Sequence, residues 1–247
     1  MAFLSRLGAA GGRFDIVVNR GSAMGITGRI AASVNLVEDG ARVLNWSWGV
    51  HRTDTFDREG GAIVNNVRSN LAMLGYERLL ERYFHWLQRH HPDVVVVNSA
   101  GNSASTTDDH LPASLDFGQL LVVGGHQRNP LAQNVAEPGF AAPRDGSNRG
   151  ERVDIYAATC PRQPRSTTRQ VGKGGGCGTS YAAALVTGVV AAMISINPDL
   201  KPEQIRSLLK RSAWRLTSDH HREGKLARLN MYRALVLANE SLREKDL

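Results

Sequence analysis

The chain has 247 residues, of which 42% are hydrophobic and 21% charged, a composition of ordinary globular domains and not of disordered, collagenous or coiled-coil chains. The formal net charge is +7, but the basic residues are scattered as singles and pairs, so we expect no nucleic-acid partner. The longest apolar run, Ala182 to Ile196, is shorter than a membrane span and indicates a buried helix, so we expect no membrane partner either.

Strands and helices alternate along the chain. Short β-branched runs predict strands buried on both faces, and apolar residues three or four positions apart predict helices. The expected strands are Phe14–Val18, Val43–Trp46, Val94–Val97, Leu120–Val123 and Val153–Ala157. The expected helices lie at 29–39, within 63–87, and at Thr179–Ile196, Pro202–Trp214 and about 230–242. This order predicts an α/β fold in which helices flank a parallel sheet, and no linker divides it.

A glycine-rich loop, Gly174-Gly175-Gly176-Cys177-Gly178, leads into Thr179 and Ser180 at the head of the longest predicted helix. Glycines let a backbone approach closely, and free N–H groups make a helix start favourable for negative charge. Three interpretations are open: Thr179 or Ser180 is an N-cap, the loop binds phosphate, or Ser180 is a nucleophile. The phosphate interpretation is disfavoured because the chain has no complete Gly-x-Gly-x-x-Gly or Gly-Lys-Ser/Thr motif.

A second candidate segment, Ser99-Ala100-Gly101-Asn102, follows the predicted strand at Val94–Val97. Ligands of open α/β sheets bind at this carboxyl edge, and an Asn side chain there can donate to the oxyanion of an acyl transfer. The alternative is an Asx turn that closes the strand. Another predicted strand reaches the same edge at Ser47-Trp48-Gly49.

Taken together, these segments resemble the subtilisin-like serine peptidases, peptidase S8. In that family one cleft wall ends in Ser-x-Gly, a small-residue run ends in the oxyanion-hole Asn, and the nucleophile lies in Gly-Thr-Ser-x-Ala-x-Pro. The matching segments are Ser47-Trp48-Gly49, Ser99-Ala100-Gly101-Asn102 and Gly178-Thr179-Ser180-Tyr181-Ala182-Ala183, and Pro112-Ala113-Ser114 precedes a strand that ends at Val123-Gly124. Ala184 stands where the family usually has Pro, which removes no catalytic group.

The resemblance implies a three-layer α/β/α fold with a mostly parallel, subtilisin-like sheet. It also implies a serine endopeptidase that acts through an acyl-enzyme on Ser180, with the oxyanion held by the Asn102 side chain and the Ser180 N–H. A polypeptide substrate would lie along Ser47-Trp48-Gly49 as an added strand, with Trp48 narrowing the cleft. Ser99-Ala100-Gly101 would line the pocket for the residue before the scissile bond.

No cofactor is implied. Calcium binding has no motif in this chain, and the carboxylates of Asp108, Asp109 and Asp154 are expected to be solvated in loops.

Two motifs of the family are missing from the sequence. The catalytic Asp, in Asp-Ser/Thr-Gly, and the catalytic His, in His-Gly-Thr-His, precede the strand that matches Phe14–Val18, and this chain contains neither. We therefore expect an N-terminally incomplete peptidase domain at 14–247, a remnant or tag-like segment at 1–13, and a separate or missing segment that supplies Asp and His. Alone, the chain would be inactive. The alternative is a non-catalytic pseudopeptidase that binds peptides or acts as a scaffold.

The family also bears on the two cysteines. By analogy with it, the segment between Val153–Ala157 and Ser180 folds back on itself, which would bring Cys160 and Cys177 together beside the nucleophile. They form a disulfide or remain two reduced, small hydrophobic residues, and the sequence leaves both possibilities open.

Overall fold

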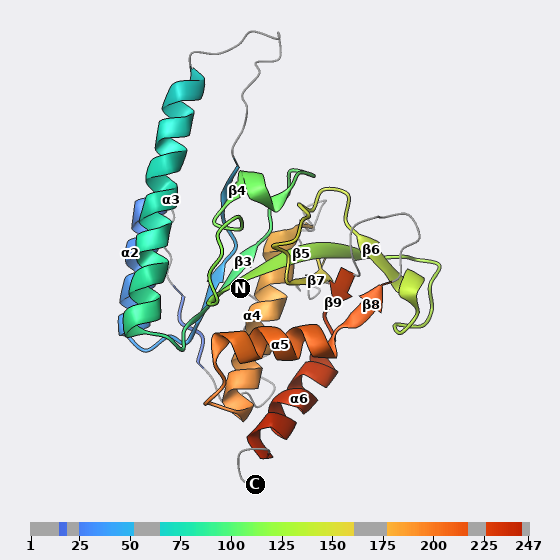
Figure 1. Cartoon of the computed structure of the whole chain (residues 1–247). Coiled ribbons are helices and arrows are strands. Elements are labelled where there is room, and N and C mark those ends of the chain that lie inside the picture. The colour runs from blue at the N-terminus through green and yellow to red at the C-terminus, as the bar shows by residue number, and fades with distance from the viewer. Residues whose placement is uncertain (1–14, 19–24, 52–64, 161–176, 217–225, 244–247) are drawn as a thin grey trace, which may run out of the picture.

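A computed structural model describes residues 15–18, 25–51, 65–160, 177–216 and 226–243 (Figure 1). The α-helices are α2 (Ile26–Glu38), α3 (Asn65–His90), α4 (Thr179–Ile196), α5 (Pro202–Ser212) and α6 (Met231–Arg243). The strands are β1 (Val43–Trp46), β2 (Val50–His51), β3 (Val95–Ser99), β4 (His110–Leu111), β5 (Leu120–Arg128), β6 (Ala141–Pro143), β7 (Ile155–Ala158), β8 (Trp214–Leu216) and β9 (Leu226–Arg228). Two short 3-10 helices lie at Thr107–Asp109 and Pro138–Phe140.

The main sheet has the strand order β1-β3-β5-β7-β9-β8, and β6 pairs with β5. Strands β1, β3, β5, β7 and β9 run parallel, while β6 and β8 are antiparallel to their neighbours. Parallel neighbours need crossover connections. Helix α3 lies in the connection from β1 to β3, and α4 and α5 lie in the connection from β7 to β9, whereas β3, β5 and β7 are joined by segments that contain only short strands and 3-10 helices. The predicted mostly parallel α/β sheet is thereby confirmed.

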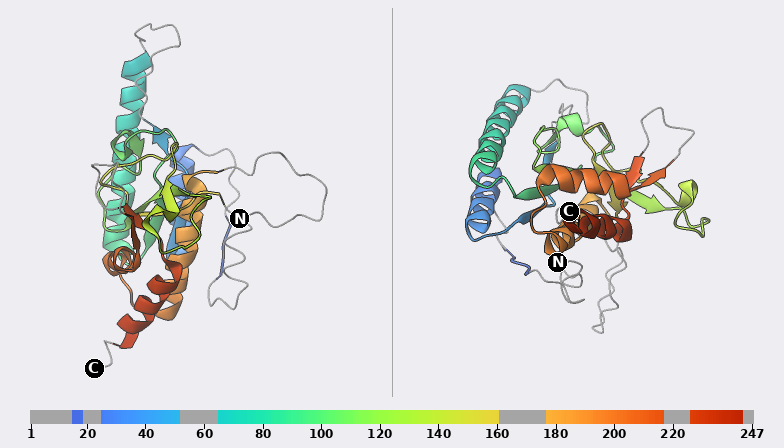
Figure 2. Two further views of the ribbon diagram at one scale, coloured as in Figure 1. Left: turned by 90° about the vertical axis from the view of Figure 1, so that its right-hand side faces the viewer. Right: turned by 60° about the horizontal axis from the view of Figure 1, so that its bottom comes forward.

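Helices cover both faces of this sheet. Successive side chains of a strand point to opposite faces, so Val95 and Val97 of β3 pack with α4, α5 and α6, whereas Val96 packs with α2 and α3. Figure 2, right, shows α2 and α3 on one side of the molecule and α4, α5 and α6 on the other. The three-layer α/β/α arrangement is therefore confirmed.

Helix α4 lies at the centre of the core. It has the bounds predicted for it, contacts β1, β3, β5 and β7, and packs along α6. By length and apolar composition alone it could cross a membrane, but 61% of it is buried inside the protein, including the fully buried Val186 and Val190. Its apolar character is thus that of a core helix.

The predicted strand at Phe14–Val18 is wrong. Phe14 lies outside the described residues, and Asp15–Val18 has no regular secondary structure, with 70% of Val17 exposed. A β-branched run forms a strand only where a neighbouring strand satisfies its backbone groups. Among the described residues, the sheet ends at β1 on this side, and nothing there pairs with 15–18.

Asp154 is not a solvated loop carboxylate as expected. It is 9% exposed, its Oδ2 accepts a hydrogen bond from Val122 N at 3.0 Å, and its Oδ1 lies 3.1 Å from Arg206 Nε and 2.7 Å from Lys210 Nζ. Arg206 also donates to the carbonyl oxygens of Phe117 and Leu120. This carboxylate therefore fastens α5 to the sheet.

Candidate active site

Ser180 lies in the first turn of α4, directly above the end of β1. Its Oγ donates a hydrogen bond to the carbonyl oxygen of Ser47 at 3.3 Å, and the hydroxyl of Ser47 donates to the carbonyl oxygen of Ser180 at 2.9 Å. The N–H groups of a first helical turn have no partner within the helix, so the Ser180 N–H is a donor for a ligand. Ser180 is half-buried.

The N-cap of α4 is Gly178, so the interpretation of Thr179 or Ser180 as the N-cap is wrong. The Thr179 N–H is instead satisfied from another part of the chain. The side-chain oxygen of Asn102 accepts hydrogen bonds from the Thr179 backbone N at 2.9 Å and from the Thr179 hydroxyl at 3.2 Å. A Cβ at position 178 would lie 3.2 Å from that oxygen, so a side chain there would require the Asn102 carboxamide to shift slightly.

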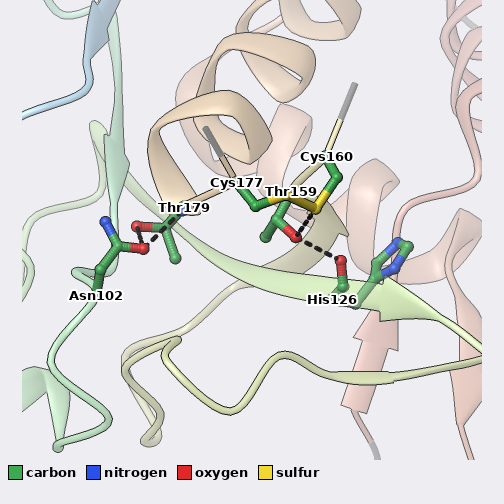
Figure 3. Close-up of a disulfide and its surroundings, with 6 residues drawn as sticks. All are labelled: Asn102, His126, Thr159, Cys160, Cys177 and Thr179. Atoms are coloured by element: carbon green, nitrogen blue, oxygen red, sulfur yellow. Dashed lines mark hydrogen bonds between the residues drawn. A yellow bond between two sulfur atoms is a disulfide. The ribbon is translucent and has the colours of Figure 1, made fainter. Parts of the chain in front are cut away.

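These two bonds fix the orientation of the Asn102 carboxamide. Because its oxygen faces Thr179, its NH₂ group is turned away from the helix, as Figure 3 shows. Asn102 is exposed, so its NH₂ can reach a bound ligand.

The two predicted substrate segments are joined below the site by Asn98. Its fully buried side chain donates to the carbonyl oxygens of Trp46 at 2.8 Å and Trp48 at 2.9 Å. The Trp48 ring packs against Trp46 at a tilt of 39°, with ring centroids 4.8 Å apart, and the Arg29 guanidinium lies 5.5 Å from the centre of the Trp48 ring. Trp48 therefore packs on the α2 side, whereas Ser47 contacts α4.

Past this bridge, Gly49 and Gly101 both face the imidazole of His110. A Cβ on Gly49 would lie 1.9 Å from His110 Cε1, and a Cβ on Gly101 would lie 2.4 Å from His110 Cδ2. Gly101 has a φ of +104°, a backbone conformation that favours glycine. Sequence reasoning missed His110, because its place follows from the pairing of β2 with β4 and from no local motif.

His110 is buried. The residue is 7% exposed, and its Nδ1 has no hydrogen-bond partner among the residues that the structure describes. Burial, with a smaller contribution from His51, lowers the pKa of His110 from 6.5 to about 4. The imidazole is therefore neutral at pH 7.

A disulfide between Cys160 and Cys177 ties the end of β7 to the start of α4 (Figure 3). The two Cα atoms are 4.6 Å apart, and next to them Gly178 N donates to the carbonyl oxygen of Thr159 at 3.1 Å. Of the two possibilities that the sequence left open, the structure adopts the disulfide. Cys177 lies three residues before Ser180, so the disulfide anchors the segment that carries Ser180.

No imidazole is hydrogen-bonded to Ser180 Oγ within the part of the chain that the structure describes; the acceptor is the Ser47 carbonyl oxygen. In the same ranges, no group of three or more His, Cys, Asp or Glu side chains is placed to hold a metal ion.

The sequence model of the Subtilase family of peptidases matches residues 14–234, so the chain belongs to this family. Fervidolysin from Fervidobacterium pennivorans is 30% identical over 200 residues, which are 75% of this chain and 24% of fervidolysin. Subtilisin-like protease SBT3.4 from Arabidopsis thaliana is 34% identical over 87 residues, 35% of this chain and 10% of that protein.

A solved structure of a lanthipeptide protease has the same fold, with a TM-score of 0.58 and 22% identity, over 87% of this chain and 67% of that one. The chain thus spans 24% or less of the length of the two sequence relatives named above.

Proposed function

We propose that the chain carries the nucleophile and the oxyanion-binding groups of a serine endopeptidase that hydrolyses peptide bonds in polypeptides. One observation supports this proposal: the oxygen of the Asn102 carboxamide accepts two hydrogen bonds from Thr179, the residue next to Ser180, which brings an amide NH₂ group to the helix start that carries the Ser180 hydroxyl and N–H. A hydroxyl beside two convergent N–H donors is the arrangement that acyl transfer needs.

In the proposed reaction, a base takes the Ser180 proton and Oγ adds to the peptide carbonyl carbon. The carbonyl oxygen becomes an oxyanion, which accepts hydrogen bonds from Asn102 Nδ2 and from the Ser180 N–H. The C–N bond then breaks as the leaving amine takes up the proton, which leaves an ester on Ser180. Water then attacks this ester, the oxyanion forms again at the same donors, and Ser180 Oγ leaves and takes up a proton.

We assign the remaining groups of the site by the same reasoning. The substrate lies as an added strand along Ser47-Trp48-Gly49, and Ser99-Ala100-Gly101 borders the residue whose carbonyl is attacked. The base and the Asp that orients it are supplied by polypeptide outside residues 1–247, since the sequence has neither His-Gly-Thr-His nor Asp-Ser/Thr-Gly.

This proposal implies that residues 1–247 alone are inactive. A helix start stabilises negative charge but accepts no proton, and an oxyanion site without a base leaves only a residual roughly 10³–10⁴-fold acceleration over water. The hydroxyl of Ser180 donates a hydrogen bond to the carbonyl oxygen of Ser47, and a carbonyl oxygen is too weak a base to take the hydroxyl proton.

The test compares two preparations: the chain alone, and the chain together with the polypeptide that carries Asp-Ser/Thr-Gly and His-Gly-Thr-His. Each is incubated with an unfolded protein and, separately, with a fluorophosphonate that labels activated serines. We expect cleavage and stoichiometric labelling in the second preparation alone, both abolished by Ser180→Ala.

Two results would contradict this. Rapid Ser180 labelling and cleavage by the chain alone would place a base within it, and His51, two residues after Gly49, would be the first residue to mutate. Peptide binding without labelling in either preparation would favour the pseudopeptidase.

A further inference from the structure

A side-chain-sized slot borders the proposed oxyanion site. Strands β1 and β3 are in register as far as Trp46 and Asn98, and the Asn98 amide holds the next residues of both segments together. Beyond it the segments separate, and Gly49 and Gly101 face each other without side chains. The peptide carbonyl that Ser180 attacks must lie beside Asn102, so the side chain of the same residue meets this slot.

The imidazole of His110 already occupies the slot. Its Nδ1 and Cε1 face Gly49, and its Cδ2 and Nε2, on the opposite edge of the ring, face Gly101. The ring therefore spans the whole distance between the two glycine backbones. A Cβ on either glycine would overlap the ring, which shows that the packing leaves no spare width.

The ring is also held in place. His110 begins β4, which pairs with β2, and its carbonyl oxygen accepts a hydrogen bond from Ser114 N at 2.8 Å. The following Leu111 is fully buried, and its carbonyl oxygen lies 2.7 Å from the position of a Cβ on Gly49. The backbone that carries the imidazole is thus fixed by a strand pair and a hydrogen bond.

We infer that His110 determines substrate specificity by filling the space between Gly49 and Gly101, so that the residue on the acyl side of the cleaved bond is glycine, alanine or serine. This inference rests on the proposed function. A longer side chain at that position would have to displace the ring, whereas a hydrogen, methyl or hydroxymethyl group lies over it without overlap.

The chemistry of the slot gives no reason to prefer an acidic residue. His110 is neutral at pH 7, because burial lowers its pKa to about 4. The other side chain against Gly101 is Asn148, fully buried and uncharged, whose oxygen accepts from Ser103 N and Ser105 N at 2.9 and 3.2 Å. Size and not charge is therefore the selecting property.

The test uses acylated peptide boronic acids that differ only in the residue bearing boron: the glycine, alanine, leucine, phenylalanine and aspartate analogues. Ser180 Oγ gives a lone pair to boron, its proton passes to solvent, and a tetrahedral boronate anion forms at the oxyanion site. Binding is measured by calorimetry on the preparation that contains both the chain and the polypeptide carrying Asp-Ser/Thr-Gly and His-Gly-Thr-His, because the proposed function places the base for the Ser180 proton there. We expect the alanine analogue to bind roughly tenfold or more tightly than the leucine and phenylalanine analogues.

Variants separate the slot from general packing. His110→Ala should bind the leucine and phenylalanine analogues at least as tightly as the alanine analogue. His126→Ala is the matched control, since His126 is equally buried at 9% exposure on β5 and contacts neither glycine, and it should keep the wild-type order. The wild-type order alone decides the question if His110→Ala does not fold.

Three results would overturn the inference. Equal binding of the alanine and leucine analogues by the wild-type chain would mean that the ring swings aside freely. Tightest binding of the aspartate analogue would mean that the slot selects by charge. Binding of all analogues that is absent, or unchanged in Ser180→Ala, would overturn the proposed function and this inference with it.

Discussion

The side-chain oxygen of Asn102 accepts two hydrogen bonds from Thr179, one from the backbone N at 2.9 Å and one from the hydroxyl at 3.2 Å. Asn102 follows β3 and Thr179 begins α4, so a single carboxamide links two segments that lie 77 positions apart in the sequence. In the proposed function, the NH₂ of this same carboxamide donates to the oxyanion. Structure and chemistry are thereby coupled in one side chain.

The first prediction separates these two functions of Asn102. In the complete enzyme, Asn102→Ala should lower kcat by roughly 10²–10³ with little change in KM, because the NH₂ donor acts in the transition state. Asn102→Asp keeps the oxygen that Thr179 needs but loses the donor, so it should lose activity with a smaller loss of stability. Peptide hydrolysis and thermal unfolding of both variants provide the measurement, and unaltered kcat in Asn102→Asp would remove Asn102 from the oxyanion site.

The second prediction concerns Cys160 and Cys177. Thiol titration of the denatured, unreduced chain should find no free thiol, and two after reduction. The bridge spans a sequence separation of 17, and its loss in the Cys160→Ser, Cys177→Ser double variant should lower the free energy of unfolding by about 3 kcal/mol by loop entropy. Two free thiols before reduction would contradict the structure at this point.

The third prediction concerns acid stability. Burial and, to a lesser degree, the charge of Arg228 lower the pKa of His126 from 6.5 to about 4. Between these two pH values the unfolded chain binds a proton that the folded chain does not. The contribution of neutral His126 to the free energy of unfolding is therefore complete above pH 6.5 and is lost as the pH falls towards 4, about 3 kcal/mol in all. His126→Gln should flatten the unfolding free energy between pH 7 and 4, measured by urea denaturation, whereas His85→Gln at an exposed position should not. Equal slopes in wild type and His126→Gln would refute this assignment.

The fourth prediction concerns Asp154. Asp154→Ala leaves the Val122 N–H and the Arg206 guanidinium without their carboxylate, which should lower the free energy of unfolding by about 2 kcal/mol or more. Lys210→Ala removes a cation that is 48% exposed and should cost less than about 1 kcal/mol. Chemical denaturation of the two variants compares them directly, and similar losses would mean that Asp154 acts as an ordinary surface charge.

The elements predicted best are those with strong local signals. Val43–Trp46 is a short, mostly apolar run, and Thr179–Ile196 is an apolar helix bounded by Gly178 and Asn197. Both have the predicted bounds. Two- and three-residue strands such as β2, β4 and β6 carry too little pattern to be found. The prediction of a strand at Phe14–Val18 was wrong for the opposite reason. Its local pattern is strong, but a strand also needs a neighbouring strand to pair with.

The same division holds at the site. Ser180 and Asn102 could be placed together because each lies in a motif whose position in the fold is known from the family. The hydrogen bond that Thr179 makes to Asn102 and the place of His110 could not be predicted. Both depend on side-chain contacts between segments far apart in sequence, which a local motif does not specify.

The position of α4 also constrains how the chain can fold during synthesis. Strands β1, β3, β5 and β7 are all made before α4, yet that helix covers one face of each of them. Until residue 196 has left the ribosome, the valines and leucines of that face are not covered by α4, and incomplete chains expose an apolar surface that is prone to aggregation. We therefore expect nascent chains of this protein to depend on chaperones until their last quarter emerges, and truncations before Thr179 to accumulate as aggregates.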